Sequence, residues 1–152
     1  MTHFSITRLH LRSLFRLPAF FRWNVPIVRA LETAPGLIEA RLYVDGGRTV
    51  WTVTLWENRA AMTAFRDSGA HQIAMPKLQE LADESHVAQG EGAPPATLEA
   101  TFRYLVDKGR ASRLKHPSSR HAAKTFAFPR PWGRPQVIRR ARQPADAESR
   151  AP

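Results

Sequence analysis

The chain has 152 residues, 43% of them hydrophobic and 24% charged, which is enough apolar sequence for one folded domain and excludes wholesale disorder. It has no cysteine, which excludes a disulfide framework, a thiolate metal site and a cysteine nucleophile. The net charge of +10 by itself suggests a nucleic acid or an acidic membrane surface as partner, so the position of the charges matters.

The chain begins with a predicted strand and helix. His3–Leu11 is rich in β-branched, aromatic and leucine residues and has no Gly or Pro, which indicates a strand. From Pro18 to Ala34, apolar residues recur every three or four positions, which predicts a helix with a kink or a split at Pro26. Gly36 follows Pro35 and is suited to a left-handed helix cap, so the helix should end there.

A β-hairpin is the clearest local pattern. Residues 38–44 alternate between apolar and polar types, which is typical of a half-buried strand. Asp45-Gly46-Gly47 is a hairpin turn signal, and Thr49–Trp56 is the partner strand. Both faces of that second strand are substantially apolar.

A helix in two parts follows the hairpin. Asn58 is a good N-cap, and Met62 and Phe65 form an apolar edge before Ser68-Gly69 interrupts the pattern. Helical spacing resumes at Ala70, with Pro76 as a second breaker.

The remaining elements are shorter. Ser85–Gln89 suggests a short strand, and residues 90–95 a loop. Thr97–Lys108 has helical spacing and is closed by Gly109, and Ala111–Lys115 suggests a last short strand.

The order of elements predicts an α+β, ferredoxin-like β-α-β-β-α-β fold, with a four-stranded antiparallel sheet and two helices on one face. We expect this domain at residues 1–92, a helical extension with a possible short strand at 93–128, and a tail at 129–152. The other sheet face would carry large apolar side chains of the hairpin. We therefore expect a second subunit to cover it, giving a homodimer that forms a dimeric α/β barrel.

The excess charge lies entirely in the last third of the chain. Residues 1–102 contain ten basic and ten acidic residues, whereas 103–152 hold 13 of the 23 basic and 3 of the 13 acidic residues. Residues 129–152 are rich in Pro and Arg and poor in apolar residues, which predicts a disordered basic tail. Five arginines and one stacking ring in this tail could bind nucleic acid: Arg130, Arg134, Arg139, Arg140 and Arg142, with Trp132. A solvated tail is the favoured interpretation.

No apolar stretch is long enough to span a membrane. The N-terminus is rich in Arg and free of acidic residues, as a transit peptide is, but Arg8, Arg12 and Arg16 interrupt its apolar part, which argues against a secretory signal. We expect a cytoplasmic protein. No phosphate loop, dinucleotide fingerprint or nucleophile elbow is present in the sequence, which argues against nucleotide chemistry.

Several short motifs resemble a known superfamily. Residues 52–58 (Thr-Val-Thr-Leu-Trp-Glu-Asn), the Ala60-Ala61-Met62 helix start and the Ser68-Gly69-Ala70-His71 turn are similar to dimeric α/β-barrel proteins of the antibiotic-biosynthesis monooxygenase type. The pattern is most similar to spheroidene monooxygenase-type carotenoid oxygenases. The resemblance covers about residues 3–90 and implies the same fold and dimer.

The resemblance also bears on cofactors. Haem-degrading members of the superfamily use an Asn, a Trp and an axial His, and the aligned positions here are Thr7, Phe65 and Met75. All three depart from that pattern. The cofactor is accordingly open between none and haem.

Candidate site residues come from one histidine and a set of aromatic and polar side chains. His71 is the candidate catalytic group, either as a base toward a phenolic substrate or as an iron ligand; a hydrogen bond to a backbone carbonyl is the alternative role. The candidate substrate-binding residues are Trp23, Arg41, Tyr43, Trp51, Trp56 and Phe65. Core or dimer packing is the favoured alternative for the tryptophans, of which only one of Trp51 and Trp56 can line the cleft. For Arg41 and Tyr43, which share one strand face, the favoured alternative is that both are solvated strand residues. His116 and His121 have a poor spacing for a metal, and we expect none.

The leading hypothesis is a monooxygenase-like enzyme that oxidises an apolar aromatic or polyene molecule in the cleft between sheet and helices. The alternative is a non-catalytic dimeric module that binds a small molecule or a protein.

Overall fold

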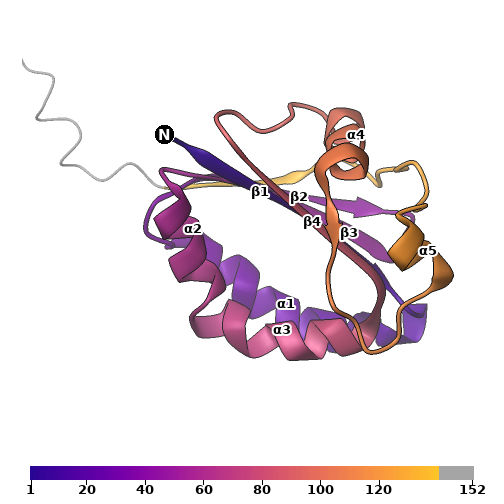
Figure 1. Ribbon diagram of the computed structural model, residues 1–152. Coiled ribbons are helices and arrows are strands. Elements are labelled where there is room, and N and C mark those ends of the chain that lie inside the picture. The colour runs from indigo at the N-terminus through magenta and orange to yellow at the C-terminus, as the bar shows by residue number, and fades with distance from the viewer. Residues whose placement is uncertain (141–152) are drawn as a thin grey trace, which may run out of the picture.

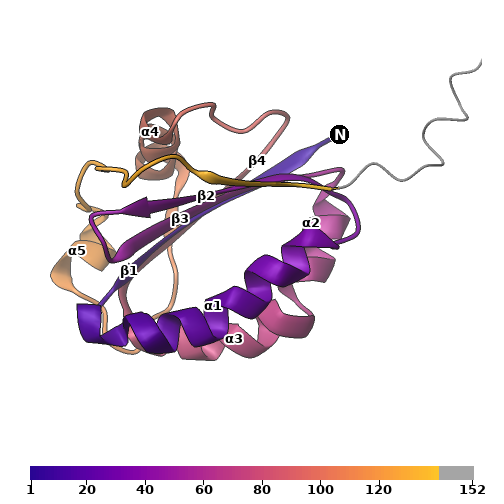
Figure 2. The same cartoon turned by 180° about the vertical axis from the view of Figure 1, so that it is seen from behind.

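The computed structural model describes residues 1–140, which form a sheet between two layers of helices (Figures 1 and 2). The antiparallel sheet has six strands in the order β5-β4-β1-β3-β2-β6. The strands are β1 His3–Leu11, β2 Leu37–Asp45, β3 Thr49–Trp56, β4 Ala82–Glu91, β5 Arg110–Ala111 and β6 Gln136–Arg139. The helices are α1 Leu17–Glu32, α2 Arg59–Arg66, α3 Gly69–Leu81, α4 Leu98–Lys108 and α5 Ser119–Ala123, and a 3-10 turn, Leu14–Arg16, precedes α1. The predicted α+β, ferredoxin-like fold is confirmed.

The two internal prolines do not end their helices. Pro26 lies inside α1 and Pro76 inside α3, and both helices continue past them. Each proline removes one backbone hydrogen bond, but both rings are exposed, so the carbonyl that each frees faces solvent and can bind water. The expected split of the first helix at Pro26 is therefore wrong.

The start of α2 packs closely against the turn before β2. Asn58 caps α2, since its side chain accepts a hydrogen bond from the Ala61 amide at 2.9 Å. Gly36 has a φ of +79°, and a Cβ there would lie 2.6 Å from the Cβ of Ala61. Glycine at this position thus allows both the turn and the close approach of α2.

Helices α1, α2 and α3 cover one face of the sheet (Figure 1). Two apolar clusters join them to it: Leu31, Leu37, Trp56 and Met62 near α2, and Leu11, Phe20, Ala74 and Leu78 between α1 and α3. The core on this side lies at the two ends of the helix layer.

The chain's own C-terminal extension covers the opposite face. Phe4, Ile6, Trp51 and Val53 of the sheet pack there against extension residues Leu98, Leu105 and Phe126. The sequence-based argument for a homodimer rested on this face being open, so the structure removes that argument. The missing cover is supplied by residues 98–126 of the same chain.

The expectation of a disordered tail from residue 129 is wrong for residues 129–140. Asp45 accepts a hydrogen bond from the Arg130 amide at 2.8 Å, and β6 pairs with β2 along residues 136–139. Ile138 is buried in the cluster of Trp56 and Met62. The four residues of β6 pair with the otherwise free edge of β2. The few apolar residues of this segment gave no indication of that pairing. Residues 141–152 of the expected tail lie outside the described residues.

Within residues 1–140, no helix has the length and apolar character needed to cross a bilayer.

Candidate functional site

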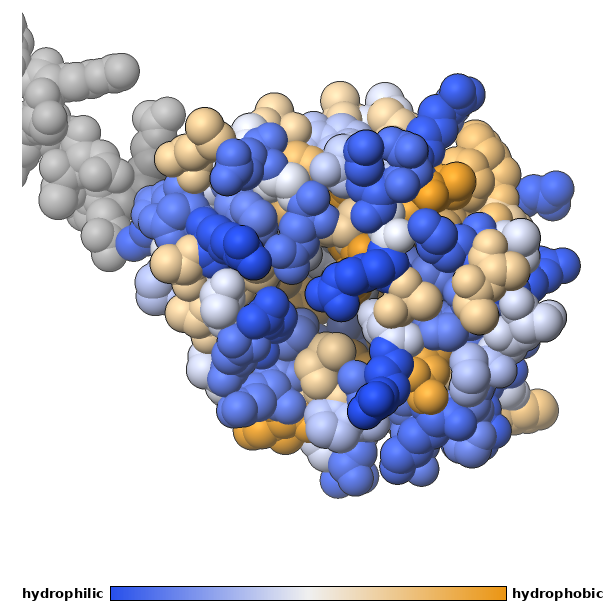
Figure 3. All heavy atoms as spheres, in the orientation of Figure 1, coloured by the Kyte–Doolittle hydropathy of each residue, from blue (hydrophilic) through white to orange (hydrophobic). Residues whose placement is uncertain are grey.

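A cavity of about 620 Å³ lies between the sheet and the layer of α1, α2 and α3. Figure 3 shows a hollow near the middle of the molecular face in view, in the same orientation as Figure 1. Its volume falls within the range of small-molecule sites. The cavity is therefore the candidate functional site.

The floor of the cavity consists of small hydroxyl residues. Ser5 and Thr7 of β1 lie beside Thr54 and Thr52 of β3, since the register pairs these residues across the two strands. Side chains two residues apart on a strand share a face, so all four point toward the helix layer. These small side chains leave the space that larger apolar residues would fill.

Aromatic rings form one wall of the cavity. Trp56 at the end of β3 and Phe65 of α2 have ring centroids 5.3 Å apart, and both line the cavity. The Trp56 indole N–H donates to Thr54 Oγ1 at 2.9 Å, so its one polar group is satisfied within the protein. Trp56 is only 1% exposed, so the half-buried Phe65 ring supplies most of the aromatic surface that an apolar ligand could contact.

His71 lines the cavity at the start of α3. The chain turns at Gly69, with a φ of +56°, and this brings His71 within 5.8 Å of the Phe65 ring. His71 Nδ1 lies 3.0 Å from the Arg66 carbonyl oxygen, and a carbonyl only accepts, so Nδ1 carries the hydrogen. Nε2 consequently holds the lone pair. Burial lowers the pKa of His71 below its usual 6.5, which keeps the imidazole neutral near pH 7.

The structure brings His71, Trp56 and Phe65 together, but not the other four predicted binding residues. Trp23 lies between α1 and α3, with Lys77 Nζ 5.8 Å from its ring. Arg41 donates to the carbonyls of Pro95 and Ala96, and Tyr43 packs in the cluster under the extension.

Trp51 lies on the sheet face away from the cavity. It packs against Phe126, and its indole N–H donates to Asp45 at 3.0 Å. Of Trp51 and Trp56, only Trp56 lines the cavity, as the strand alternation requires.

The sequence patterns did not identify the amide side chains in the cavity wall as site residues. Asn24, Gln72, Gln79 and Gln89 line the cavity. Asn24 had a detectable signal, because it falls within the apolar stripe of α1, four residues after Phe20 and three before Ile27. A polar residue at such a position often faces a ligand or a polar cavity. The glutamines had no comparable signal.

The three positions aligned with the haem-degrading pattern all line the cavity. Thr7, Phe65 and Met75 are each part of the wall. Their side chains, however, offer a hydroxyl, a hydrocarbon ring and a thioether in place of an amide, an indole and an imidazole. The residues present therefore do not fit the haem site of those proteins.

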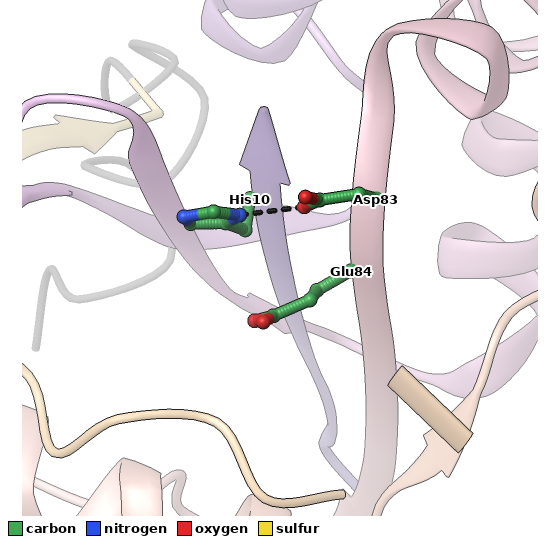
Figure 4. A group of neighbouring side chains, drawn as sticks. All are labelled: His10, Asp83 and Glu84. Atoms are coloured by element: carbon green, nitrogen blue, oxygen red, sulfur yellow. Dashed lines mark hydrogen bonds and ion pairs between the residues drawn. The ribbon is translucent and has the colours of Figure 1, made fainter. Parts of the chain in front are cut away.

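A second cluster of possible metal ligands lies at the far end of β1, where His10, Asp83 and Glu84 approach one another (Figure 4). His10 Nδ1 lies 2.6 Å from Asp83, and Arg48 Nε donates to His10 Nε2 at 3.3 Å. Arg8 donates to Glu84 at 2.6 Å. The three ligand groups are thus engaged by protein partners, two of them arginines that oppose a cation.

Comparisons with known proteins agree with this architecture. Residues 26–77 match the family model described as antibiotic biosynthesis monooxygenase. This segment runs from the middle of α1 into α3 and supplies Trp56, Phe65 and His71 of the cavity. No curated protein sequence matches the chain.

Solved structures show the same fold. Rv0793 from Mycobacterium tuberculosis is 16% identical, with a TM-score of 0.56, over 64% of this chain and 100% of that one. An antibiotic biosynthesis monooxygenase from Nitrosomonas europaea is 10% identical, with a TM-score of 0.55, over 63% and 94%. A variant of SnoaB from Streptomyces nogalater, titled a cofactor-independent oxygenase, is 12% identical, with a TM-score of 0.51, over 62% and 96%.

The chain therefore has the ferredoxin-like fold of antibiotic biosynthesis monooxygenase domains, and residues 26–77 carry that family's sequence pattern. These structures cover 62–64% of the chain, so more than a third of it has no counterpart in them.

Proposed function

We propose that the chain is a monooxygenase-like enzyme that oxidises an apolar aromatic or polyene molecule in the cavity, with His71 as the base. The observation that carries the proposal is one cavity with an aromatic wall, in which Phe65 packs on the buried Trp56, and a neutral imidazole at its edge.

The proposed chemistry uses the substrate as its own reductant. His71 Nε2 accepts a proton from a phenol or an acidic C–H group, and the resulting anion donates an electron to O2. Recombination forms a carbon–peroxide bond. Cleavage of the O–O bond then leaves one oxygen atom on the attacked carbon as a carbonyl, while the other departs as water with the hydrogen of that carbon and the proton that His71 had accepted. The apolar walls keep water away from the substrate anion and from the peroxide.

The family match and the fold of SnoaB, titled a cofactor-independent oxygenase, support oxygenase chemistry. The resemblance of residues 52–58 and 68–71 to spheroidene monooxygenase-type proteins makes a polyene the alternative substrate; a polyene has no acidic proton for His71 and would need another means of activating O2. The departures at Thr7, Phe65 and Met75 favour an enzyme that works without haem.

A non-catalytic binding module is the second candidate. It is favoured by the partner of His71, since the Arg66 carbonyl is neutral and the cavity places no carboxylate in hydrogen bond to the ring. An imidazolium formed during catalysis would have weaker stabilisation than in a His–carboxylate pair.

Oxygen uptake separates the two candidates. Purified protein is mixed with dihydroxynaphthalene, a flat quinol, and O2 consumption is recorded against a protein-free blank and against His71→Gln. His116→Gln, at an exposed histidine outside the cavity, is the matched control. Uptake that His71→Gln abolishes and His116→Gln keeps supports the enzyme. Binding of the quinol without uptake, measured by quenching of tryptophan fluorescence, supports the module.

Haemin titration tests the cofactor separately. A Soret band that saturates at one haemin per chain and disappears in His71→Gln would contradict the cofactor-free form of the proposal.

A further inference from the structure

The outer face of α1 carries apolar side chains where a surface helix ordinarily carries polar ones. Phe15 and Leu14, in the 3-10 turn before α1, are 95% and 57% exposed. Phe21 and Val25 follow on the solvent side of α1, at 52% and 39% exposed. Because Phe21 and Val25 are four residues apart, they lie on one helical face and continue the apolar surface that begins at Phe15.

The neighbouring helix extends this surface. Helices α1 and α3 lie side by side under the sheet (Figures 1 and 2), and Ile73 of α3 is 65% exposed. Trp23 lies between the two helices. The Arg22 guanidinium lies 5.4 Å from its ring, and Nζ of Lys77 in α3 lies 5.8 Å from the same ring. Figure 3 shows hydrophobic beside hydrophilic residues along the lower edge of the molecule, over these helices.

The charge around this surface is mostly positive. Arg12, Arg16, Arg22 and Arg29 lie in or next to α1, and the sequence has no acidic residue before Glu32. Among residues 1–140, the ion pairs include none of Arg16, Arg22 and Arg29. The exposed apolar side chains thus lie within a cationic border whose charge is not neutralised by the described part of the chain.

We propose that this surface, formed by the turn Leu14–Arg16, the outer side of α1 and Ile73, docks on an anionic lipid bilayer. A helix with Phe, Trp and Leu beside arginines lies in the plane of a membrane interface, where the apolar side chains enter the acyl boundary and the cations contact lipid phosphates. Each arginine side chain can bind phosphate oxygens while its aliphatic stem stays in the apolar layer.

A bilayer fits this surface better than a second copy of the chain. A two-fold contact centred on Phe21 and Val25 would bring Arg22 and Arg29 of two chains near one another, and Glu32 at the end of α1 is the one acidic residue of that helix. An anionic membrane supplies the opposite charge at every arginine. The nearly complete exposure of Phe15 on a short turn also suits insertion between lipids.

The docking surface and the cavity are the two sides of one helix. Phe20, Asn24 and Ile27 on the inner side of α1 line the cavity, while Phe21 and Val25 point outward. An apolar molecule dissolved in the bilayer would then lie about one helix diameter, roughly 10 Å, from the cavity. The docking itself does not depend on the proposed function; the delivery of an apolar substrate from the bilayer does.

Vesicle co-sedimentation tests the docking with the full chain. Vesicles of phosphatidylcholine alone are compared with vesicles that also contain phosphatidylglycerol, across a series of salt concentrations. We expect binding to the anionic vesicles that weakens as salt rises. Arg22→Gln with Arg29→Gln should weaken it about fivefold for each arginine removed.

The contribution of the apolar side chains to vesicle binding is tested by a variant that combines Phe15→Ser, Phe21→Ser and Val25→Ser. It should lower vesicle binding by roughly tenfold or more, because three exposed apolar groups lose their burial in lipid. All three residues are exposed, so circular dichroism should show an unchanged fold. The matched control is Val106→Ser, which removes an exposed apolar group from α4 on the opposite layer and should leave binding unchanged.

Three results would overturn the docking proposal. The first is equal binding of the parent chain and the triple serine variant, which would assign vesicle binding to another segment such as the C-terminal residues. The second is absence of binding to anionic vesicles at low salt. The third is a dimer in light scattering that the triple serine variant dissociates, which would assign the surface to a second copy. Quinol-dependent oxygen uptake without vesicle binding would sink the docking while keeping the proposed function.

Discussion

The two faces of the sheet are built on opposite plans. On the α1–α3 side, the central positions of β1 and β3 are Ser5, Thr7, Thr52 and Thr54, and a cavity lies above them. On the other side, the same strands present Phe4, Ile6, Trp51 and Val53, and the extension packs directly onto them. Alternate residues of two strands thus create an open site on one face and a dense core on the other.

This difference between the two faces indicates that one face mainly stabilises the fold, while the other is available for ligand binding. The extension side also buries the Arg8–Glu84 ion pair, and the Arg8 guanidinium lies 4.5 Å from the Phe126 ring. Packing on this side therefore depends on several specific contacts between buried side chains. The cavity side has fewer such contacts at its centre. Substitutions on the extension side should therefore affect folding, and those on the cavity floor should affect ligand binding.

The largest effect is expected at Glu84. Glu84→Ala leaves the Arg8 guanidinium buried without its carboxylate, which should lower the free energy of unfolding by about 3–5 kcal/mol. Urea denaturation followed by tryptophan fluorescence measures it. Glu99→Ala, at the exposed pair with Arg103, is the control and should change stability by less than about 1 kcal/mol. Equal effects of the two variants would contradict the buried role of Glu84.

Leu105 tests whether the extension is part of the core. Its side chain is fully buried, so Leu105→Ala should cost about 2–5 kcal/mol in unfolding free energy. The neighbouring Val106→Ala, at a 40% exposed position on the same helix, should change it by about 0.5 kcal/mol or less. If Leu105→Ala were as mild as Val106→Ala, the extension would not contribute to the core.

His86 on the extension side should make stability depend on pH. Burial lowers the pKa of His86 from its usual 6.5. As the pH falls below 6.5, the unfolded chain takes up a proton that the folded chain does not, so the free energy of unfolding should decrease. His86→Gln, which keeps a donor toward the His121 carbonyl, should make this decrease smaller. Denaturant titrations at a series of pH values measure the slope, and identical slopes would exclude His86 as a source.

The smallest stability effect is expected on the cavity floor. Thr52→Val keeps the size and shape of the side chain while removing a hydroxyl, and it should change the unfolding free energy by only about 0.5 kcal/mol. Binding of an apolar dye such as anilinonaphthalene sulfonate should become tighter, because the floor becomes less polar. A fluorescence titration tests this, and unchanged affinity would indicate that the dye does not reach the floor.

The local elements could be predicted because their signals are local. The alternation in 38–44, the Asp45-Gly46-Gly47 turn and the Asn58 cap depend on neighbouring residues, and these elements form where the patterns indicate. For the candidate cavity, strand alternation indicated that only one of Trp51 and Trp56 could line it, and the place of His71 after Gly69 indicated that it would lie near the cleft; the roles of these residues stay predictions. Arg41 and Tyr43 could not be placed, because their strand face is covered by residues more than fifty positions later.

The segment after residue 129 shows even more clearly that contacts between residues distant in the sequence cannot be predicted from local patterns. Gln136–Arg139 contains only two apolar residues, and nothing in its own sequence distinguishes it from a solvated segment. It becomes a strand because the edge of β2, about a hundred residues earlier, offers unpaired backbone groups and a place for Ile138. Such a partner lies beyond the reach of periodicity or composition.

The position of the extension at the end of the chain has a consequence during synthesis. The strands that carry Phe4, Ile6, Trp51 and Val53 leave the ribosome before Leu98, Leu105 and Phe126 do. At about 5–20 residues per second, the stretch from the end of β4 to the end of β6 takes roughly 2–10 s to be made. For that interval the nascent sheet exposes its most aromatic face. We therefore expect it to be a target for chaperones that bind growing chains, and release from them to depend on completion of the last forty or so residues of the described chain.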